Sequence, residues 1–448
     1  MTSPDPWLER LLHSWLPRQR WYPAKGRGVS IHSVGGRRLD GPADPADSTG
    51  GVALELHVLA LDSGDQVDVV QVPLSYRDAP LEGAEQALVG RLPDGDRGER
   101  WVYDGPHDPV YVQALLGELE TAPGTRRPDP RAPARVLAGE QSNTSIIVGP
   151  VEGPGGADAF IVKVFRTLHP GANPDVEVAA ALAAVGCERI ARPVGWLSGT
   201  WTDVDGGPAT GHLAVASEFL AGSQDAWREA VTAVQQGDEF ASAAEGLGEA
   251  TAVVHLALIE AFGATAMTVD VREHLVAGLR ARVSWALASA PALAPHAGAL
   301  DRHLSALDRL VDLPDLQRVH GDYHLGQVLH SPERGWILLD FEGEPLRPLR
   351  DRVLPDLALR DVAGMLRSFD YAARHAGAQD GYGRQWAAAC RDAFCDGYGR
   401  ASGHDPRERA DVLSALELDK ALYEVVYETR NRPEWLDVPL RAVERLLG

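Results

Sequence analysis

Two neighbouring stretches decide the fold: His320-Gly-Asp-Tyr-His-Leu-Gly-Gln327 and Gly335-Trp-Ile-Leu-Leu-Asp340-Phe-Glu-Gly-Glu344. Phosphoryl transfer requires a carboxylate that positions and deprotonates the attacking hydroxyl, and oxygen ligands for the Mg²⁺ ions that neutralise the triphosphate. Asp322 can be the base, and Gln327 and Asp340 can be the ligands, because a hydrophobic strand at 336–339 delivers Asp340 to the same cleft. The joint spacing predicts a phosphotransferase that uses ATP and Mg²⁺. Either segment alone would be consistent with ordinary turn and strand-end residues.

A lysine among apolar neighbours lies upstream, in Ala157-Asp-Ala-Phe-Ile-Val-Lys163-Val-Phe. Burying an ammonium group costs on the order of several kcal/mol unless the group is paired. Glu177 is placed to pair with it, because Asn173-Pro is a signal for the start of the next helix. We predict an ion pair between Lys163 and Glu177 that holds the lysine at the ATP phosphates. A solvent-facing lysine on an edge strand is the alternative.

Two further segments complete the predicted nucleotide site. The chain lacks a Gly-x-x-x-x-Gly-Lys-Ser motif, which argues against a P-loop enzyme. A polar turn at 142–145 can instead cover phosphates with hydroxyl and backbone N–H groups. The run from Leu213 to Glu218 fits a hinge between two lobes, where backbone groups would bind adenine. The predicted nucleotide-binding residues are Lys163, Glu177, Ser142, Asn143, Thr144, Ser145, Ala216, Ser217 and Glu218.

The pattern along the chain predicts an α+β protein with three regions. Residues 28–120 alternate short apolar runs with turns, which is typical of β-hairpins. A Pro- and Arg-rich linker follows, then more strands, and helical periodicity dominates from about residue 225 onwards. We therefore predict an N-terminal β-rich domain at 1–125, a β-rich lobe with the nucleotide site at 133–222, and a helical lobe at 223–448.

Charge and composition exclude several partners. The formal net charge of -21 argues against nucleic acids and anionic membranes, which require a basic surface. The three cysteines fit no disulfide framework or zinc pattern, and the N-terminus lacks the layout of a signal peptide. No stretch approaches the roughly 18 apolar residues of a membrane span. We expect a cytoplasmic monomer that binds only small molecules.

The run Gln317-Arg-Val-His-Gly-Asp-Tyr-His-Leu-Gly-Gln-Val-Leu, with Asp340-Phe-Glu-Gly-Glu-Pro, resembles the maltokinase family of the aminoglycoside phosphotransferase and protein-kinase-like superfamily. The resemblance extends from Arg20-Trp-Tyr-Pro-Ala-Lys-Gly-Arg27 to the segment that contains Arg430-Asn-Arg-Pro-Glu-Trp. It implies a two-lobed kinase-like fold with an N-terminal cap and a large helical C-lobe. It also implies Asp322 as the base, Gln327 and Asp340 as Mg²⁺ ligands, and a sugar bound near the catalytic loop.

Sugar pockets use carboxylates, which accept from hydroxyls, and indoles, which stack on the ring face. Maltokinases usually carry Trp-Leu-Pro-Ile-Pro where this chain has Trp435-Leu-Asp437-Val-Pro, and Pro-Asp-Ser-Pro-Leu-Arg-Asp where it has Pro355-Asp-Leu-Ala-Leu-Arg-Asp361. The added carboxylate of Asp437 favours an acceptor with an ammonium group, although a turn-capping role is the alternative. The predicted acceptor residues are Asp322, His324, Glu342, Glu344, Arg430, Asn431, Glu434, Trp435 and Asp437.

These observations favour a glucosamine kinase of the maltokinase-like family that forms glucosamine 6-phosphate. A maltokinase that forms maltose 1-phosphate is the alternative within the same class. An ATP-binding pseudokinase is the alternative of another class, and the intact Lys163, Asp322, Gln327 and Asp340 argue against it. A protein kinase is disfavoured because residues 340–342 read Asp-Phe-Glu and no Gly-rich nucleotide loop is present.

Overall fold

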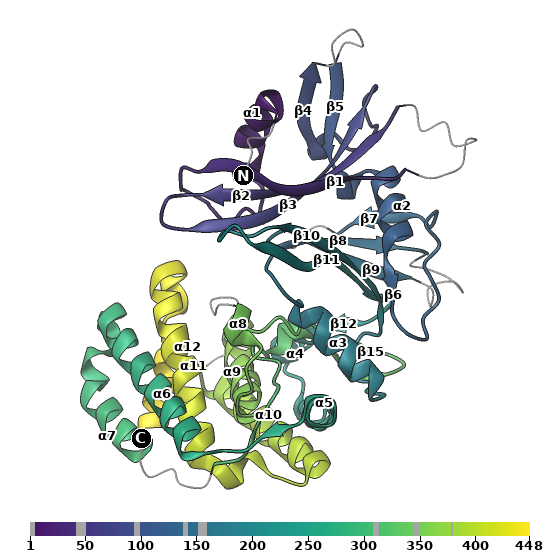
Figure 1. Ribbon diagram of the computed structural model, residues 1–448. Helices are drawn as coiled ribbons and strands as arrows, with labels where there is room; N and C mark the ends of the chain where they lie inside the picture. Colours follow the sequence, from purple (N-terminus) through teal and green to yellow (C-terminus); the bar gives the residue numbers. More distant parts are fainter. Residues whose placement is uncertain are drawn as a thin grey trace. The chain divides into compact units, whose positions relative to one another are not determined.

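The structure is a computed structural model of the 448-residue chain, and it describes residues 5–41, 51–93, 99–137, 142–150, 159–307, 313–344, 349–377 and 380–448. The chain divides into two compact units. The first contains Met1–Ala180 and Ala191–Ala221, and the second contains Ala181–Ile190 and Gly222–Gly448. Figure 1 shows that strands dominate the first unit and helices the second.

The first unit begins with a five-stranded antiparallel sheet. Helix α1 (Pro6–Trp15) precedes it and is capped by Asp5, whose carboxylate accepts from the backbone N–H of Trp7 at 2.9 Å. Alternating apolar residues of the strands and of α1 form a shared core that includes Leu12, Trp15 and Leu59. The strand order is β1 (Ser30–Leu39), β2 (Ala53–Asp62), β3 (Val67–Arg77), β5 (Glu99–Asp104) and β4 (Leu88–Pro93).

A six-stranded antiparallel sheet completes the first unit. Its order is β6 (Glu120–Thr121), β10 (Pro193–Thr202), β11 (Pro208–Glu218), β9 (Phe160–Phe165), β8 (Asn143–Val148) and β7 (Ala134–Val136). Helix α2 (Pro109–Glu118) and residues of both sheets share one hydrophobic cluster. Arg166 crosses between the sheets: it is fully buried and donates to Asp104 at 2.6 Å and to Thr144 at 2.9 Å. This buried ion pair ties the N-terminal sheet to the second sheet.

Helices build most of the second unit. They are α4 (Ala226–Gln236), α5 (Ala241–Phe262), α6 (Val269–Ser289), α7 (Ala297–Leu307), α8 (Leu349–Arg352), α9 (Leu359–His375), α10 (Asp380–Ser402), α11 (Ala410–Asn431) and α12 (Asp437–Leu447), while α3 (Pro174–Ala184) spans the boundary between the units. Glycines allow α5 and α10 to approach closely. A Cβ atom on Gly248 would lie 2.1 Å from the Phe394 carbonyl oxygen, and one on Gly397 would collide with the Glu245 carbonyl oxygen.

Short strands carry the catalytic segments of the second unit. A three-stranded sheet has the order β12 (Gln224–Asp225), β15 (Val328–Ser331) and β16 (Gly335–Leu338), and β13 (Ala264–Thr265) pairs with β14 (Leu316–Gln317). The β15–β16 pairing brings the end of the first catalytic segment beside the start of the second, with Val328 opposite Leu338. The strand expected at 336–339 is therefore present as β16.

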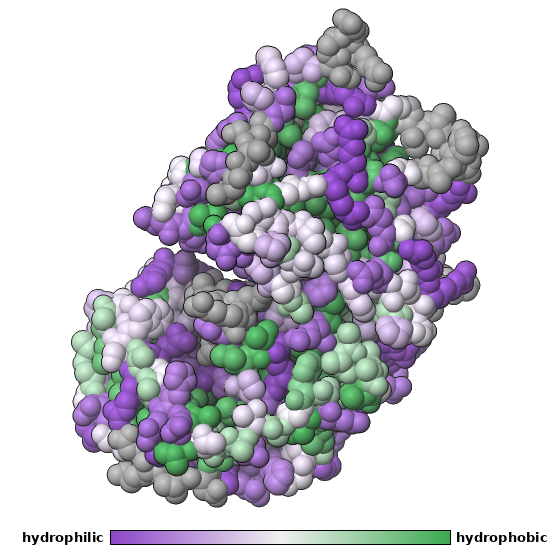
Figure 2. All heavy atoms as spheres, viewed as in Figure 1, coloured by the Kyte–Doolittle hydropathy of each residue, from purple (hydrophilic) through white to green (hydrophobic). Residues whose placement is uncertain are grey.

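The predicted fold class is confirmed: the first unit is β-rich and the C-terminal region is helical. The boundary expected between residues 125 and 133 stays a prediction. None of the described helices is long and apolar enough to cross a membrane. On the face drawn in Figure 2, apolar patches are interspersed with hydrophilic residues.

Candidate active site

The catalytic loop of the second unit is held by a buried carboxylate on α9. Asp361 is 1% exposed and accepts from the backbone N–H groups of His320 at 2.7 Å and Gly321 at 2.9 Å. His255 on α5 contacts the same carboxylate through Nε2 at 3.1 Å. Burial alone would raise the pKa of Asp361, but the hydrogen bond and positive charge of His255, with the Gly321 N–H, lower it. Asp361 therefore stays ionised and fixes the backbone directly before Asp322.

His320 connects the loop to the second catalytic segment. Its Nε2 atom lies 2.7 Å from the carbonyl oxygen of Leu339, which can only accept, so Nε2 carries the hydrogen. The ring also packs against Phe341 at a centroid distance of 4.9 Å. The loop and the segment that carries Asp340 are thus joined on both sides of Asp340.

Asp340 has an unusual backbone conformation. Its φ of 64° is the only positive value found for a non-glycine residue in the described part of the chain. Such a conformation costs on the order of 1 kcal/mol and is common at functional sites. Gln327 Nε2 donates to Asp340 Oδ2 at 3.3 Å, so the two predicted metal ligands are neighbours. A carboxylate beside an amide fits Mg²⁺, which takes few protein oxygens and completes its shell with phosphate and water.

Lys420 on α11 contacts Asp322, the predicted base. Its ammonium group donates to Asp322 Oδ1 at 3.3 Å, and its side chain is 27% exposed. Burial lowers the pKa of Lys420, but the carboxylates of Asp322, Glu424 and Glu344 outweigh it and raise the pKa. The lysine therefore remains charged beside the carboxylate.

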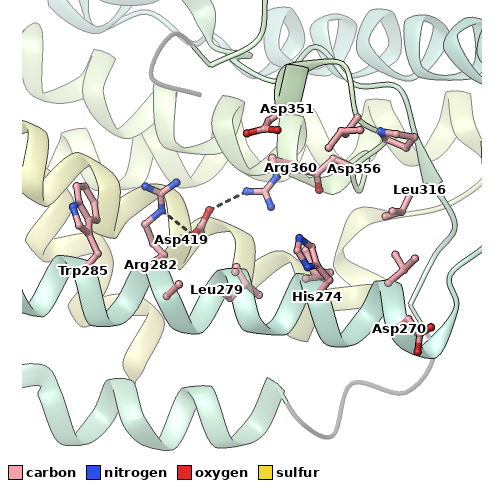
Figure 3. Close-up of a pocket in the computed structure, with 16 residues that line it drawn as sticks. Asp270, His274, Leu279, Arg282, Trp285, Leu316, Asp351, Asp356, Arg360 and Asp419 are labelled. Carbon is pink, nitrogen blue, oxygen red and sulfur yellow. Dashed lines mark hydrogen bonds and ion pairs between the residues drawn. The ribbon is translucent and has the colours of Figure 1, made fainter. Parts of the chain in front are cut away.

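A pocket of about 850 Å³ lies between α6, α11 and residues 351–360 of the second unit. Figure 3 shows Arg282 and Arg360 approaching Asp419 from opposite sides, at 3.2 and 2.9 Å. Four aspartates line the pocket against two arginines and one histidine; the charged lining residues are Asp270, Asp351, Asp356, Asp419, His274, Arg282 and Arg360. With the histidine neutral, the lining carries a surplus of two negative charges, which attracts cations.

Each wall of this pocket contains an aspartate whose neighbour in sequence interacts with the catalytic segments. On α11, Lys420 follows Asp419 and reaches Asp322. On the opposite wall, Arg352 follows Asp351. Burial lowers the pKa of Arg352, and the carboxylates of Glu342, Asp322 and Glu344 oppose this shift, which places those three carboxylates around one guanidinium. The structure therefore gathers Glu342 and Glu344 near Asp322.

His324 lies in the same loop, and its role as a sugar contact remains a prediction. Its Nδ1 atom accepts from the backbone N–H of Gly326 at 3.1 Å, which caps a short helical turn. The pKa of His324 is lowered by burial, with opposing contributions from Asp322 and Asp340. The contact that the structure describes is that of a hydrogen-bonded loop residue.

The remaining predicted acceptor residues lie at the end of α11 and the start of α12. Arg430 lies over the Trp285 ring at 5.9 Å, and Asn431 donates to the Tyr427 carbonyl at 2.9 Å. Trp435 stacks on Tyr371 and His375, at centroid distances of 6.3 and 5.5 Å. Asp437 pairs with Arg374 at 3.2 Å and Arg441 at 3.5 Å, whereas Glu434 is exposed. An ammonium group would have to compete with two arginines for Asp437, so its predicted sugar contact stays untested.

The predicted nucleotide residues belong to the first unit. Lys163 on β9 lies opposite Ser145 on β8, and its ammonium donates to Asp175 at 3.3 Å. The described partner of Lys163 thus lies on the helix expected to supply it, two residues before Glu177, and the pairing with Glu177 remains a prediction.

The other predicted nucleotide residues are placed as follows. The side chains of Asn143 and Thr144 are buried against Arg166, Ser142 is exposed, and Ala216, Ser217 and Glu218 end strand β11. Residues 139–141 of the same predicted turn lie outside the described residues.

Comparison with known proteins identifies the family. The phosphotransferase enzyme family matches residues 133–410, and the maltokinase N-terminal cap domain matches residues 15–108. The chain belongs to the phosphotransferase enzyme family. The resemblance to maltokinase-like phosphotransferases and the prediction of a phosphotransferase are thereby confirmed.

Several relatives of this phosphotransferase are glucosamine kinases. The chain is 29% identical to the glucosamine kinase of Mycolicibacterium smegmatis over 407 residues, which cover 82% of this chain and 96% of the relative. It is also 29% identical to the glucosamine kinase of Streptacidiphilus jiangxiensis over 431 residues, 87% of this chain and 95% of the relative. A solved glucosamine kinase in complex with glucosamine, ADP and inorganic phosphate is 25% identical, with a TM-score of 0.65 and 100% of both chains covered.

Sequence reasoning about this phosphotransferase missed two residues that contact the catalytic loop. Asp361 ends the run 355–361, which stood out only as a departure from the maltokinase pattern. Lys420 directly follows Asp419 on α11, so it lacks the apolar neighbours on both sides that identified Lys163 on its strand. Its sequence neighbours offer a local carboxylate, and they could not have named Asp322 as the partner.

Proposed function

We propose that this phosphotransferase is a glucosamine kinase, which transfers the γ-phosphoryl group of ATP to a hydroxyl of D-glucosamine and forms glucosamine 6-phosphate and ADP. The observation that carries the proposal is the surplus of carboxylates at the Asp322–Lys420 pair, where Glu342 and Glu344 gather, together with an acidic pocket whose lining includes Asp419, the residue before Lys420. A surplus of negative charge suits a sugar with an ammonium group better than a neutral sugar. The glucosamine kinases among the relatives, one of them solved with glucosamine and ADP, support the same acceptor.

In this proposal the hydroxyl oxygen of the sugar forms a bond to the γ-phosphorus of ATP, and the bond from that phosphorus to ADP breaks. Asp322 takes the proton of the attacking hydroxyl. Lys420 orients the Asp322 carboxylate and balances its charge until the proton arrives. Asp361 is a positioning residue, because it fixes the peptide groups of His320 and Gly321. Gln327 and Asp340 would hold Mg²⁺, which neutralises phosphate charge when bound. Lys163 keeps its proposed role at the ATP phosphates.

We propose that acceptor selectivity does not come from Asp437. That carboxylate already has two arginine partners, while Glu342 and Glu344 lie near Asp322 with Arg352 among them. We therefore assign recognition of the sugar ammonium to the carboxylates of the pocket and of the loop after Asp340. Trp435 and Asn431 remain proposed sugar contacts.

The test is ATP consumption with Mg²⁺ against glucosamine, N-acetylglucosamine, glucose, maltose and an aminoglycoside. We expect the highest kcat/KM with glucosamine and a loss of at least tenfold with N-acetylglucosamine, which has the same ring without the charge. Asp322→Asn should reduce kcat by about 10²-fold or more while ADP binding is retained. Equal turnover of the charged and uncharged sugars would contradict the acidic-pocket assignment. Near-normal turnover by the Asn variant would contradict the base.

Maltose is the second candidate acceptor, because the maltokinase N-terminal cap domain matches residues 15–108. The same assay distinguishes the two activities by the product. Glucosamine 6-phosphate is a primary phosphate ester and maltose 1-phosphate an anomeric one, and ³¹P–¹H coupling separates them. An anomeric product from maltose at the higher kcat/KM would replace the glucosamine proposal.

A further inference from the structure

One face of α9 lies along the catalytic loop. Asp361, Gly364 and Ser368 are spaced i, i+3 and i+7, so all three project from the same side of the helix. The loop, from residue 320 to residue 325, contacts these three residues in chain order. The contacts extend over about 10 Å along the helix axis. Asp322 lies between the first contact and the last.

Gly364 allows the chain beside Asp322 to lie directly on α9. A Cβ atom on Gly364 would lie 2.5 Å from the carbonyl oxygen of Tyr323, the residue after Asp322. Cβ atoms do not approach other heavy atoms to within 3.0 Å, so a larger residue would displace the loop or bend the helix. Glycine is otherwise a poor residue for a helix interior, because its backbone loses more freedom on folding. The close approach of the loop gives this position a reason to be glycine.

Ser368 holds the loop on the other side of Asp322. Its hydroxyl oxygen accepts from the backbone N–H of Leu325 at 3.0 Å, and both residues are buried. Leu325 begins the short helical turn Leu325–Gln327, and the first N–H groups of such a turn have no acceptor within it. Removing the hydroxyl would therefore leave a buried donor unpaired. Ser368 thus fixes the start of the turn that ends at Gln327.

A contact on α5 fixes the loop from a second helix. The hydroxyl of Tyr323 lies 2.7 Å from Thr251 Oγ1, and Thr251 donates its own hydrogen to the Leu247 carbonyl at 2.8 Å. Thr251 therefore accepts from Tyr323. Both side chains are buried. The residue after Asp322 is held by its carbonyl group on α9 and by its side chain on α5.

We propose that Gly364 and Ser368 are positioning residues for phosphoryl transfer and that, with Asp361, they hold the catalytic loop along α9. The inference rests on the proposed roles of Asp322 as the base and Gln327 as a Mg²⁺ ligand. Each positioning residue acts through a backbone group of the loop. Displacing a catalytic group by about 1 Å slows a reaction by as much as about 10²-fold. Gly364 governs the position of the base and Ser368 that of the turn, so their substitutions should have separable effects.

The first test compares Ser368→Ala with Ser331→Ala in the full chain. Both serines are 6% exposed and accept a backbone N–H, but the donor to Ser331 is Arg334, in the turn between β15 and β16. We expect Ser368→Ala to speed hydrogen exchange of the segment 318–328 at least about tenfold. Its kcat should fall about tenfold, while the KM of the acceptor stays within about twofold. Ser331→Ala should leave kcat and loop exchange unchanged.

Calorimetric titration of Mg²⁺ into the ADP-saturated chain tests the turn that ends at Gln327. Ser368→Ala should bind Mg²⁺ several-fold more weakly than wild type, because the start of the turn is no longer held. Unchanged Mg²⁺ binding by this variant would overturn the role assigned to the turn. Ser331→Ala should bind Mg²⁺ as wild type does.

Gly364→Ala tests the contact beside the base, with Gly298→Ala as its control. A Cβ atom on Gly298, in α7, would meet the Arg302 side chain at 3.8 Å, an ordinary contact, so kcat should be unchanged. We expect Gly364→Ala to lower kcat by about 10²-fold and to leave Mg²⁺ binding within about twofold. If Gly364→Ala does not fold, Ser368→Ala decides the proposal.

Three results would overturn the proposal: kcat at the wild-type level in every folded variant, unchanged loop exchange in Ser368→Ala, or an equal fall of kcat in Ser331→Ala. Hydrogen exchange and Mg²⁺ binding need no acceptor, and kcat is measured with the sugar that the acceptor panel shows to be turned over fastest. A wrong acceptor therefore leaves this test intact. The result for Asp322→Asn is read separately, which distinguishes failure of the base from failure of the positioning role.

Discussion

Replacing Asp361 by Asn tests whether one buried carboxylate positions the catalytic loop. The two side chains have nearly the same shape, but the amide has one acceptor oxygen where the carboxylate has two. Oδ2 of Asp361 accepts from the His320 N–H and contacts His255, while Oδ1 accepts from the Gly321 N–H. In either orientation of the amide, its NH₂ group faces a backbone N–H that then has no acceptor.

The expected magnitude follows from these contacts. A hydrogen bond to a charged group contributes about 1.5–3 kcal/mol, and a buried donor left unpaired costs a similar amount. We expect Asp361→Asn to lower the free energy of unfolding by about 3 kcal/mol or more. If the His320 and Gly321 peptides move by about 1 Å, Asp322 moves with them, and kcat should fall by roughly 10²-fold.

The pH dependence has a defined sign. The pKa of Asp361 is lowered in the folded protein, so its stabilisation is present above the unfolded pKa of about 3.9 and is lost as pH falls through the folded value. The difference between wild type and variant should therefore be largest near neutral pH and should shrink below about pH 4.

Urea unfolding followed by tryptophan fluorescence gives the stability, and a coupled ATPase assay gives kcat. Asp405→Asn is the matched control, because Asp405 is a partly exposed cap and Asn caps a helix equally well. The free energy of unfolding of this control should fall by no more than about 1 kcal/mol, the usual contribution of a surface ion pair. A variant at 361 that loses no more stability than this control and turns over at the wild-type rate would refute the positioning role.

Three further predictions concern other contacts. Lys420→Met, which keeps the chain length without the charge, should lower kcat about tenfold with intact folding, and an unchanged kcat would show that Asp322 does not need its partner. Asp104→Asn leaves the buried Arg166 without its charged partner, so the free energy of unfolding of the first unit should fall by about 3–5 kcal/mol in chemical unfolding. The exposed control Glu99→Gln should lower it by less than about 1 kcal/mol. The pKa of His324 is lowered in the folded protein, so its contribution to the free energy of unfolding falls as pH drops below about 6.5. His324→Gln should therefore make the loss of stability on acidification smaller. Identical curves of stability against pH for wild type and variant would exclude this contribution.

Much of the catalytic loop could be predicted because its members are close in sequence. Asp322 and Gln327 are separated by one short turn, and a β-hairpin returns the chain to Asp340, so local geometry brings the two metal-ligand candidates together. The strand lysine Lys163 could be selected because an ammonium group in an apolar strand needs a partner. The structure describes a contact of Lys163 with Asp175, and the pairing with Glu177 stays a prediction. Both carboxylates lie on the first turns of α3, so periodicity alone does not choose between them.

The sequence by itself determined the fold class, the phosphotransferase chemistry and the segments that carry it, because these depend on spacing within short stretches. Only the tertiary structure decided which distant side chains hold the loop. Asp361 lies 41 residues from His320, and Lys420 lies 98 residues from Asp322. The tertiary structure also placed Asp437 against two arginines, so its carboxylate is not free for an ammonium group. Helical periodicity says which residues share a face, but the packing of one helix against another decides what that face meets.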